Sequence, residues 1–277
     1  MIVHLVDGTY ELFRHFYGQR SFNKGNDKPL GAASGVLQSV LEMIEQGATH
    51  IGVATDHVIE SFRNDLWPGY KTGVGIDPVL RAQFQPLEDG LVAMGVATWP
   101  MIELEADDAL ASAAQLAAAD PAVQKVSIWT PDKDLAQCVV EDRVVQVDRR
   151  AKKIRDATQV RKKFGVEPRL IPDYLALVGD AADGYPGIQG IGPVGAAQLL
   201  NRHGVIEAFP SKVLQGERRE LALLFKRLAT LRTDAALFEG VEALRWQGPT
   251  GAFEGWAQKA GAGRLLERCR KVSKAGG

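Results

Sequence analysis

Acidic residues recur in this chain at the ends of apolar, strand-like runs. Asp7 follows residues 2–6 and Asp56 follows residues 51–55, and other acids come after similar runs. Like charges repel and raise one another's pKa, so a folded protein keeps them on a solvated face or around a bound cation. The full set is Asp7, Asp56, Glu105, Asp107, Asp132, Asp134 and Asp180.

So many carboxylates indicate chemistry with hard divalent cations. Their combined charge exceeds what one ion neutralises, and oxygen ligands suit Mg²⁺ or Mn²⁺. Two ions roughly 4 Å apart would stabilise the attacking and the leaving oxygen of a phosphodiester displacement, with water as the nucleophile. The sequence indicates no Ser, Cys or His nucleophile. For residues 104–110 alone, an acidic first turn that matches the helix dipole is an equally good interpretation.

The elements that would position these acids alternate along the chain. Strand-like runs at residues 2–6, 51–55, 96–99 and 125–130 are separated by helical patterns, of which the one at about 106–119 is rich in Ala. Such alternation predicts an α/β fold with a mainly parallel sheet flanked by helices. The crevice at the carboxyl ends of the strands is then the expected functional site, and the acids fall there.

A glycine-rich segment follows in the second half of the chain. Helical patterns at about 170–178 and 193–201 flank a hairpin whose small residues leave backbone amides accessible. With the N-terminus of the second helix, these amides could contact phosphate oxygens of a nucleic-acid strand; an ordinary glycine turn is the alternative. The DNA-binding positions expected in this helix-hairpin-helix are Gly187, Gly190, Ile191, Gly192, Val194 and Gly195.

A basic β-hairpin at about 144–155 adds two candidates for DNA binding, Lys152 and Lys153. A run of like charges is usually a solvated face. Charge distribution matters more than net charge for nucleic-acid binding, however, and this run precedes the glycine-rich segment. We therefore expect the two lysines to contact phosphate.

Length and composition limit the number of domains and the classes of protein to which the chain can belong. With 277 residues and a formal net charge of −1, the chain can form one large or two modest domains. Its two cysteines and five histidines show no disulfide or zinc spacing. The N-terminus does not resemble a leader, and no run approaches the roughly 20 apolar residues of a membrane helix, so we expect a cytoplasmic protein that contacts no membrane.

Five ordered motifs resemble those of the 5′-nuclease family, which includes flap endonucleases and the 5′-to-3′ exonuclease domain of bacterial DNA polymerase I. The resemblance covers most of the chain, from residue 7 to about residue 200. The motifs are Asp7-Gly with Arg14 downstream, Ser61-Phe-Arg with Tyr70-Lys71, Glu105-Ala-Asp-Asp108, Asp132-Lys-Asp134-Leu with Gln137, and Gly179-Asp180-x-x-Asp183 leading into Gly190-Ile-Gly192.

The resemblance implies a PIN-like catalytic domain over residues 1–165, with an arch region at about 67–90. It implies a helical DNA-binding domain over 166–277 that contains the helix-hairpin-helix, or helix-three-turn-helix. The implied activity is hydrolysis of DNA with a 5′ flap or 5′ end, and of RNA–DNA primers. The implied cofactors are two Mg²⁺ ions, which Mn²⁺ can replace, and K⁺ held by carbonyls of the hairpin. We expect a monomer.

The resemblance also implies roles for single residues. Lys71 would approach the scissile phosphate, and the other expected catalytic cations are Arg14 and Arg81. One metal ion would lie among Asp7, Asp56, Glu105 and Asp107 and the other among Asp132, Asp134 and Asp180, with Asp108 and Asp183 in support.

The chain departs from the family's pattern at three places. Val74 stands where a second basic residue usually follows the Tyr-Lys pair, which leaves Arg81 as its substitute. Val194-Gly195 replaces a common Lys-Thr pair, and Gly184 replaces a frequent Asn. No expected metal ligand is lost, so these changes concern phosphate contacts and substrate preference.

Three alternatives stay open. An aspartyl phosphatase would share Asp7-Gly-Thr, but its nucleophilic Asp would fall at Leu5. A non-catalytic DNA-binding scaffold on the same fold would show eroded acids, whereas every expected one is present. An RNA-directed PIN ribonuclease would have no reason for the helix-hairpin-helix.

Overall fold

A six-stranded sheet organises the molecule. In this computed structural model, which describes residues 1–23 and 28–275, the strand order is β3-β2-β1-β4-β5-β6. The first five strands in that order pair in parallel and β6 pairs antiparallel with β5, which confirms the predicted mainly parallel sheet. The strands are β1 Ile2–Asp7, β2 His50–Asp56, β3 Ala97–Met101, β4 Lys125–Trp129, β5 Val144–Asp148 and β6 Lys153–Arg155.

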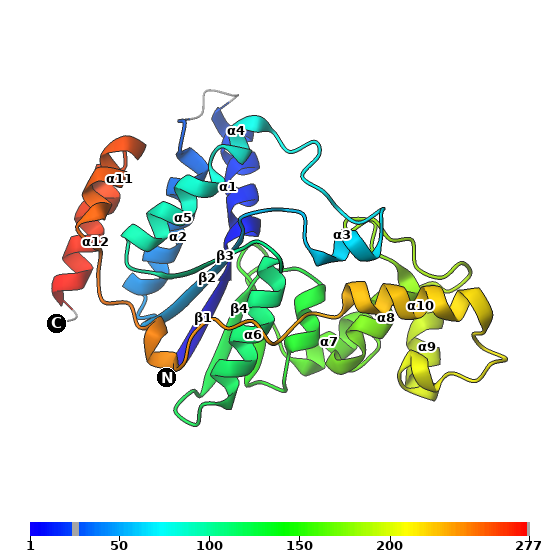
Figure 1. The fold of residues 1–277 in the computed structure, drawn as a ribbon. Helices are drawn as coiled ribbons and strands as arrows, with labels where there is room; N and C mark the ends of the chain where they lie inside the picture. The colour runs from blue at the N-terminus through cyan, green and yellow to red at the C-terminus, as the bar shows by residue number, and fades with distance from the viewer. Residues whose placement is uncertain (24–27, 276–277) are drawn as a thin grey trace.

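Helices cover both faces of this sheet, as predicted (Figure 1). Consecutive residues of a strand face opposite cores: Val6 and Val53 pack in the core formed with α1, α2 and α5, whereas Leu5 and Ala54 pack in the core formed with α6. Strands that are buried on both faces need apolar residues at nearly every position, which is why residues 2–6 form an almost unbroken apolar run. The helices are α1 Gly8–Asn23, α2 Gly31–Glu45, α5 Phe84–Ala93 and α6 Ala106–Ala119.

A second core lies beside the sheet, in a helical unit. Tyr174, Leu175 and Phe225 are among its buried residues, and α10 packs along α8. The glycine-rich hairpin connects α8 to α9, which confirms the expected helical domain with its helix-hairpin-helix. The elements of this region are α7 Ala157–Phe164, α8 Ile171–Val178, α9 Pro193–His203 and α10 Gly216–Ala229, with 3₁₀ turns η1 Asp134–Cys138, η2 Pro168–Leu170 and η3 Ile206–Ala208.

The end of the chain returns to the sheet. After α10 an extended segment runs past α6 and forms the turn η4 Val241–Leu244 (Figure 1). It leads to α11 Ala252–Ala260, which lies against α5, and to α12 Gly263–Ala275, which lies against α2. Phe253 and Trp256 join the core of the first hundred residues. The helical domain was expected to extend to residue 277, but these two helices complete the other core. Residues 276–277 lie outside the described part of the chain.

The arch region differs from its expected form. The sequence pattern predicts one helix over residues 78–94, but the structure has two, α4 Pro78–Arg81 and α5. They are separate because Gln83 between them turns inward and accepts hydrogen bonds from the backbone N–H groups of Ala32 and Ala33. Helix α5 is part of the core, with Leu87 and Leu91 buried. The segment that can cross the site is therefore α3 Phe62–Leu66, the loop at 67–77 and α4.

None of the described helices has the length and the apolar character needed to cross a membrane.

Candidate metal centre

The ends of the parallel strands bring the first carboxylates to one edge of the sheet. Asp7 ends β1, and its carboxylate accepts hydrogen bonds from the backbone N–H of Tyr10 at 2.8 Å and the hydroxyl of Thr130 at 3.0 Å. Asp56 ends β2 and accepts a hydrogen bond from the backbone N–H of Ala106, at the start of α6, at 2.8 Å. The start of α6 is thereby fixed to the edge of the sheet.

Five carboxylates form two groups that share Asp134. Within each group one carboxylate oxygen of every residue lies within 4.8 Å of the others. Asp134 belongs to both because η1 places it between the sheet edge and the glycine-rich hairpin. The first acidic group is Asp107, Asp132 and Asp134, and the second acidic group is Asp134, Asp180 and Asp183.

The electrostatics of these groups fit a bound cation. Burial, followed by the charges of Asp56 and Asp132, raises the pKa of Asp7 to about 7. Burial and the neighbouring carboxylates likewise raise the pKa of Asp107 and of Asp134 well above the ordinary value. One buried oxygen of Asp134 also has no hydrogen-bond partner within the described chain. Divalent cations would relieve this repulsion and supply the missing partner.

Two lysines contact the carboxylates. The ammonium of Lys71 lies 2.8 Å from Glu105 and 3.1 Å from Asp183, and although burial opposes it, these charges raise the pKa of Lys71 well above its ordinary value. Lys133 lies 2.5 Å from Asp180. Lys71 was expected at the site. Lys133 was missed, although its position between Asp132 and Asp134 was a usable signal.

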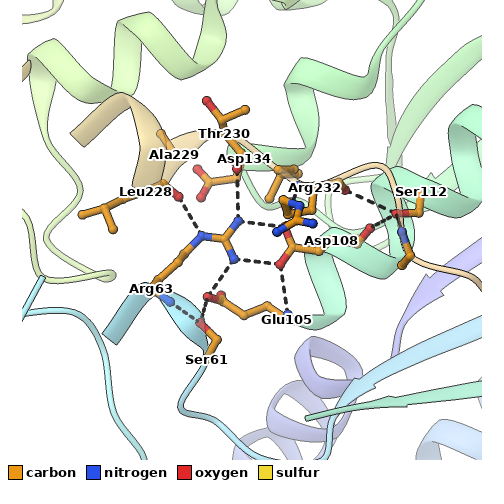
Figure 2. A network of polar contacts seen from close by, with 12 residues as sticks. Ser61, Arg63, Glu105, Asp108, Ser112, Asp134, Leu228, Ala229, Thr230 and Arg232 are labelled. Atoms are coloured by element: carbon orange, nitrogen blue, oxygen red, sulfur yellow. Dashed lines mark hydrogen bonds and ion pairs between the residues drawn. The ribbon is translucent and has the colours of Figure 1, made fainter. Parts of the chain in front are cut away.

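Arg63 is the main surprise of the site. In the glycine-containing segment 61–81, basic residues are expected at the surface, but the side chain of Arg63 is only 1% exposed and pairs with Asp108 and Glu105 (Figure 2). Burial opposes the charge, but the two carboxylates raise the pKa of Arg63 above its ordinary value. Asp108 is thus occupied by Arg63 and by backbone N–H groups, and belongs to neither acidic group.

The other two expected cations lie elsewhere. Arg14 is on α1, and its guanidinium forms a double hydrogen bond with Glu11 and contacts His15. Arg81 is exposed at the end of α4, beside the loop that carries Gly73. Neither contacts the two acidic groups among the polar contacts of the described residues.

The glycine-rich hairpin joins the metal centre to an open surface. Asp180 and Tyr185 exchange two backbone hydrogen bonds, so the hairpin fixes Asp180 in the second acidic group. Farther along, Gly190, Gly192 and Gly195 have no atom within 4 Å of the position of an added Cβ, and Val194 is 72% exposed. These are the positions expected to face DNA. Gly187 instead packs closely on the backbone of α8, and Ile191 is half-buried.

The basic hairpin has the expected form. Lys152 lies in the turn between β5 and β6 with a positive φ of 51°, and Lys153 begins β6. Both side chains are exposed. They are therefore accessible to a ligand.

The fold and the site define a class: a mainly parallel α/β protein with a carboxylate centre suited to cations at the strand ends and an attached helix-hairpin-helix. Residues 2–165 match the family model of the 5′-3′ exonuclease N-terminal resolvase-like domain, and residues 166–252 match that of the 5′-3′ exonuclease C-terminal SAM fold. The chain belongs to the 5′-3′ exonuclease family. This confirms the predicted family and sets the aspartyl-phosphatase alternative aside.

Curated relatives agree with this family. DNA polymerase I of Pseudomonas aeruginosa is 34% identical over 259 residues, which are 87% of this chain and 28% of that protein. The 5′-3′ exonuclease of Aquifex aeolicus is 31% identical over 260 residues, which cover 89% of this chain and 87% of the relative. The chain thus spans just over a quarter of the polymerase and most of the exonuclease.

Solved structures share the fold. T5 5′-exonuclease with bound zinc has a TM-score of 0.63 at 15% identity and aligns over 99% of both chains. The catalytic core of Rad2 in complex with DNA has a TM-score of 0.60 at 15% identity, over 97% of this chain and 91% of that one. At this level of identity the likeness shows the fold.

Proposed function

We propose that this protein is a 5′ nuclease that hydrolyses phosphodiester bonds in DNA with a 5′ end or 5′ flap, and in RNA–DNA primers. The observation that carries the proposal is the pair of acidic groups that share Asp134, beside the ammonium of Lys71. The named relatives are exonucleases and DNA polymerases, and a structural neighbour is described in complex with DNA.

The residues fit two Mg²⁺ ions, with Mn²⁺ as a substitute. The first acidic group, with Asp7, Asp56 and Glu105 nearby, would hold one ion, and the second acidic group the other. When bound, the ions would activate a water molecule and stabilise the oxygens on either side of the scissile phosphorus.

The chain's own side chains would bind and orient the strand. Lys71 is about one-third exposed and can donate a hydrogen bond from its ammonium to a phosphate oxygen while it stays close to Glu105. Arg81 is exposed at the other end of the loop and could bind the next phosphate. We leave Arg14 out of the catalytic set because Glu11 engages its guanidinium.

Contacts away from the metal centre would hold the duplex without reading its sequence. The backbone around Gly190, Gly192 and Gly195 is open, and it leads into the N-terminus of α9, where N–H groups favour phosphate. Lys152 and Lys153, which are exposed at the turn between β5 and β6, would add positive charge to this surface. K⁺ at the hairpin carbonyls is part of the proposal and is tested by comparing DNA affinity in K⁺ and in Na⁺. We propose that the protein acts as a monomer in the cytoplasm.

A cleavage assay tests this function. Labelled 5′-flap, nicked, single-stranded and RNA–DNA substrates are incubated with Mg²⁺ or EDTA. Asp180→Ala should reduce cleavage at least about a hundredfold, because each metal ion supplies several kcal/mol of transition-state stabilisation, while binding of the flap in Ca²⁺ persists. The control is Asp142→Asn, an exposed acid beside the amino-terminal end of β5. Binding of DNA by the wild type without cleavage in Mg²⁺ would favour the non-catalytic scaffold, and cleavage of RNA alone would favour the PIN ribonuclease.

A further inference from the structure

A single buried guanidinium uses all of its hydrogen-bonding capacity next to the metal centre. The Nε of Arg63 donates to the carbonyl oxygen of Leu228 at 2.8 Å, and Nη2 donates to that of Thr230 at 3.2 Å. The two terminal nitrogens each donate to an oxygen of Asp108 at 2.7 Å, and Nη1 also donates to Glu105 at 3.0 Å (Figure 2). An arginine has five N–H donors, and this site offers an acceptor to each.

These contacts fix one oxygen of Glu105 and leave the other facing the site. The Oε1 atom accepts hydrogen bonds from Arg63 and, at 2.6 Å, from the hydroxyl of Ser61. The Oε2 atom faces the ammonium of Lys71 at 2.8 Å and the hydroxyl of Tyr70 at 3.4 Å. The position of Lys71, and through it the contact with Asp183, therefore depends on how Glu105 is held.

The same guanidinium connects the two parts of the fold. Leu228 and Thr230 are at the end of α10, which packs on α8 in the helical unit. Asp108 is in the first turn of α6, and it accepts hydrogen bonds from the backbone N–H of Glu105 at 3.0 Å and of Arg232 at 2.8 Å. The start of α6 and the end of α10 are thus held in one polar network.

We infer that Arg63 is a positioning residue that sets Glu105, and through it Lys71, at the metal centre by tying the start of α6 to the end of α10. The inference rests on the proposed nuclease function and adds to it a residue that contacts neither metal nor substrate. Only arginine satisfies the network, because a lysine has three donors on a point charge and cannot bridge two carboxylates and two carbonyls.

The test compares Arg63→Lys with a control variant of the ion pair between α10 and α8. In Lys226→Met the buried Asp173 loses the ammonium that lies 2.9 Å away but keeps its hydrogen bond from the backbone N–H of Ile206, and neither residue belongs to an acidic group. Arg63→Lys should weaken Mn²⁺ binding, measured by calorimetric titration, and lower kcat on flap DNA, each by about 10- to 100-fold, because groups that orient metal ligands have effects of this size. The KM for DNA should change little. Lys226→Met should lower the Tm while Mn²⁺ affinity and kcat stay at wild-type values.

A second variant covers the case in which Arg63→Lys does not fold. Ser61→Ala removes one hydrogen bond to Glu105, together with the side-chain cap of α3, and leaves the guanidinium of Arg63 paired with Asp108. It should shift Mn²⁺ affinity and kcat in the same direction by a smaller factor. If the variants lose Tm but keep wild-type Mn²⁺ affinity and kcat, Arg63 is a stabilising residue only and the inference is wrong. If the wild type itself neither binds Mn²⁺ nor cleaves DNA, the proposed function fails instead.

Discussion

Asp7 shows how a buried carboxylate depends on what binds it. Its pKa is raised from the ordinary value of 3.8 to about 7, first by burial and then by the neighbouring acids. A carboxyl with a raised pKa binds more protons in the folded than in the unfolded state between these two values. The metal-free protein should therefore lose stability as the pH rises from 4 to 7, and a divalent cation should restore it.

This predicts a pH-dependent effect of Mg²⁺ on thermal stability. The increase in Tm on adding saturating Mg²⁺ should be larger at pH 8 than at pH 6, measured by calorimetry in buffers of equal ionic strength. Asp7→Asn removes the titrating group, so the Tm of the metal-free variant should vary less between pH 4 and 7. Equal Tm increases at both pH values would contradict the role given to Asp7.

The positions of the carboxylates in the site could be predicted from the sequence better than those of the basic side chains. Asp7 and Asp56 follow buried strands, so parallel pairing alone brings them to one edge of the sheet. Arg63 could not be placed in this way. Its partners include the carbonyls of Leu228 and Thr230, which are 165 and 167 residues away, and a charged residue in a polar segment is normally exposed.

At the level of the elements, the glycine-rich hairpin and the loop at 67–77 touch. A Cβ on Gly184 would lie 1.9 Å from the carbonyl oxygen of Gly69, and the Trp67 indole donates a hydrogen bond to the carbonyl of Gly184 at 3.0 Å. The backbone N–H of Lys71 also donates to the carbonyl of Asp183 at 3.0 Å. This close approach gives a physical reason for the glycine at 184, where the resemblance suggested Asn.

Two glycines with the same backbone angle allow a matched comparison. Gly184 and Gly190 both have a φ of 83°, but only Gly184 is crowded. Gly190→Ala should destabilise the fold by about 1–2 kcal/mol through left-handed strain alone. Gly184→Ala should lower the free energy of unfolding further, and also kcat, because it displaces the loop that carries Lys71. Denaturant titration measures the free energy of unfolding of the two variants, and a cleavage assay measures kcat. Equal losses of unfolding free energy in the two variants would contradict the importance of the contact with Gly69.

Most helices and strands could be predicted from the sequence, but the breaks within them could not. Apolar periodicity continues through residues 78–94, so one helix was expected. The side chain of Gln83 hydrogen-bonds to the start of α2 instead, a tertiary contact that periodicity does not encode.

At the scale of the whole molecule, the last two helices complete the core that the first hundred residues begin. The Trp256 ring fills the space over Gly90, where an added Cβ would lie 2.6 Å from the indole, and its N–H donates to the carbonyl of Pro86 at 2.8 Å. A helical region was expected here, but the sequence could not show which of the two cores its last helices join.

Trp256→Ala should therefore destabilise the sheet domain. Removing a buried tryptophan leaves a cavity and should lower the free energy of unfolding by about 3–5 kcal/mol, measured by denaturant titration. The control is Arg268→Gln, which breaks a partly exposed pair with Glu45 on α2 and should lower it by at most about 1 kcal/mol. A loss for Trp256→Ala no larger than that of the control would mean that α11 is only loosely attached.

The return of the chain also has a consequence during synthesis. A ribosome makes the strands and α5 early, but the surface that α11 and α12 cover stays bare until residues 252–275 have emerged. The sheet domain therefore cannot reach its final packing before that point, and a nascent chain stalled before Phe253 should bind chaperones through the uncovered faces of α2 and α5.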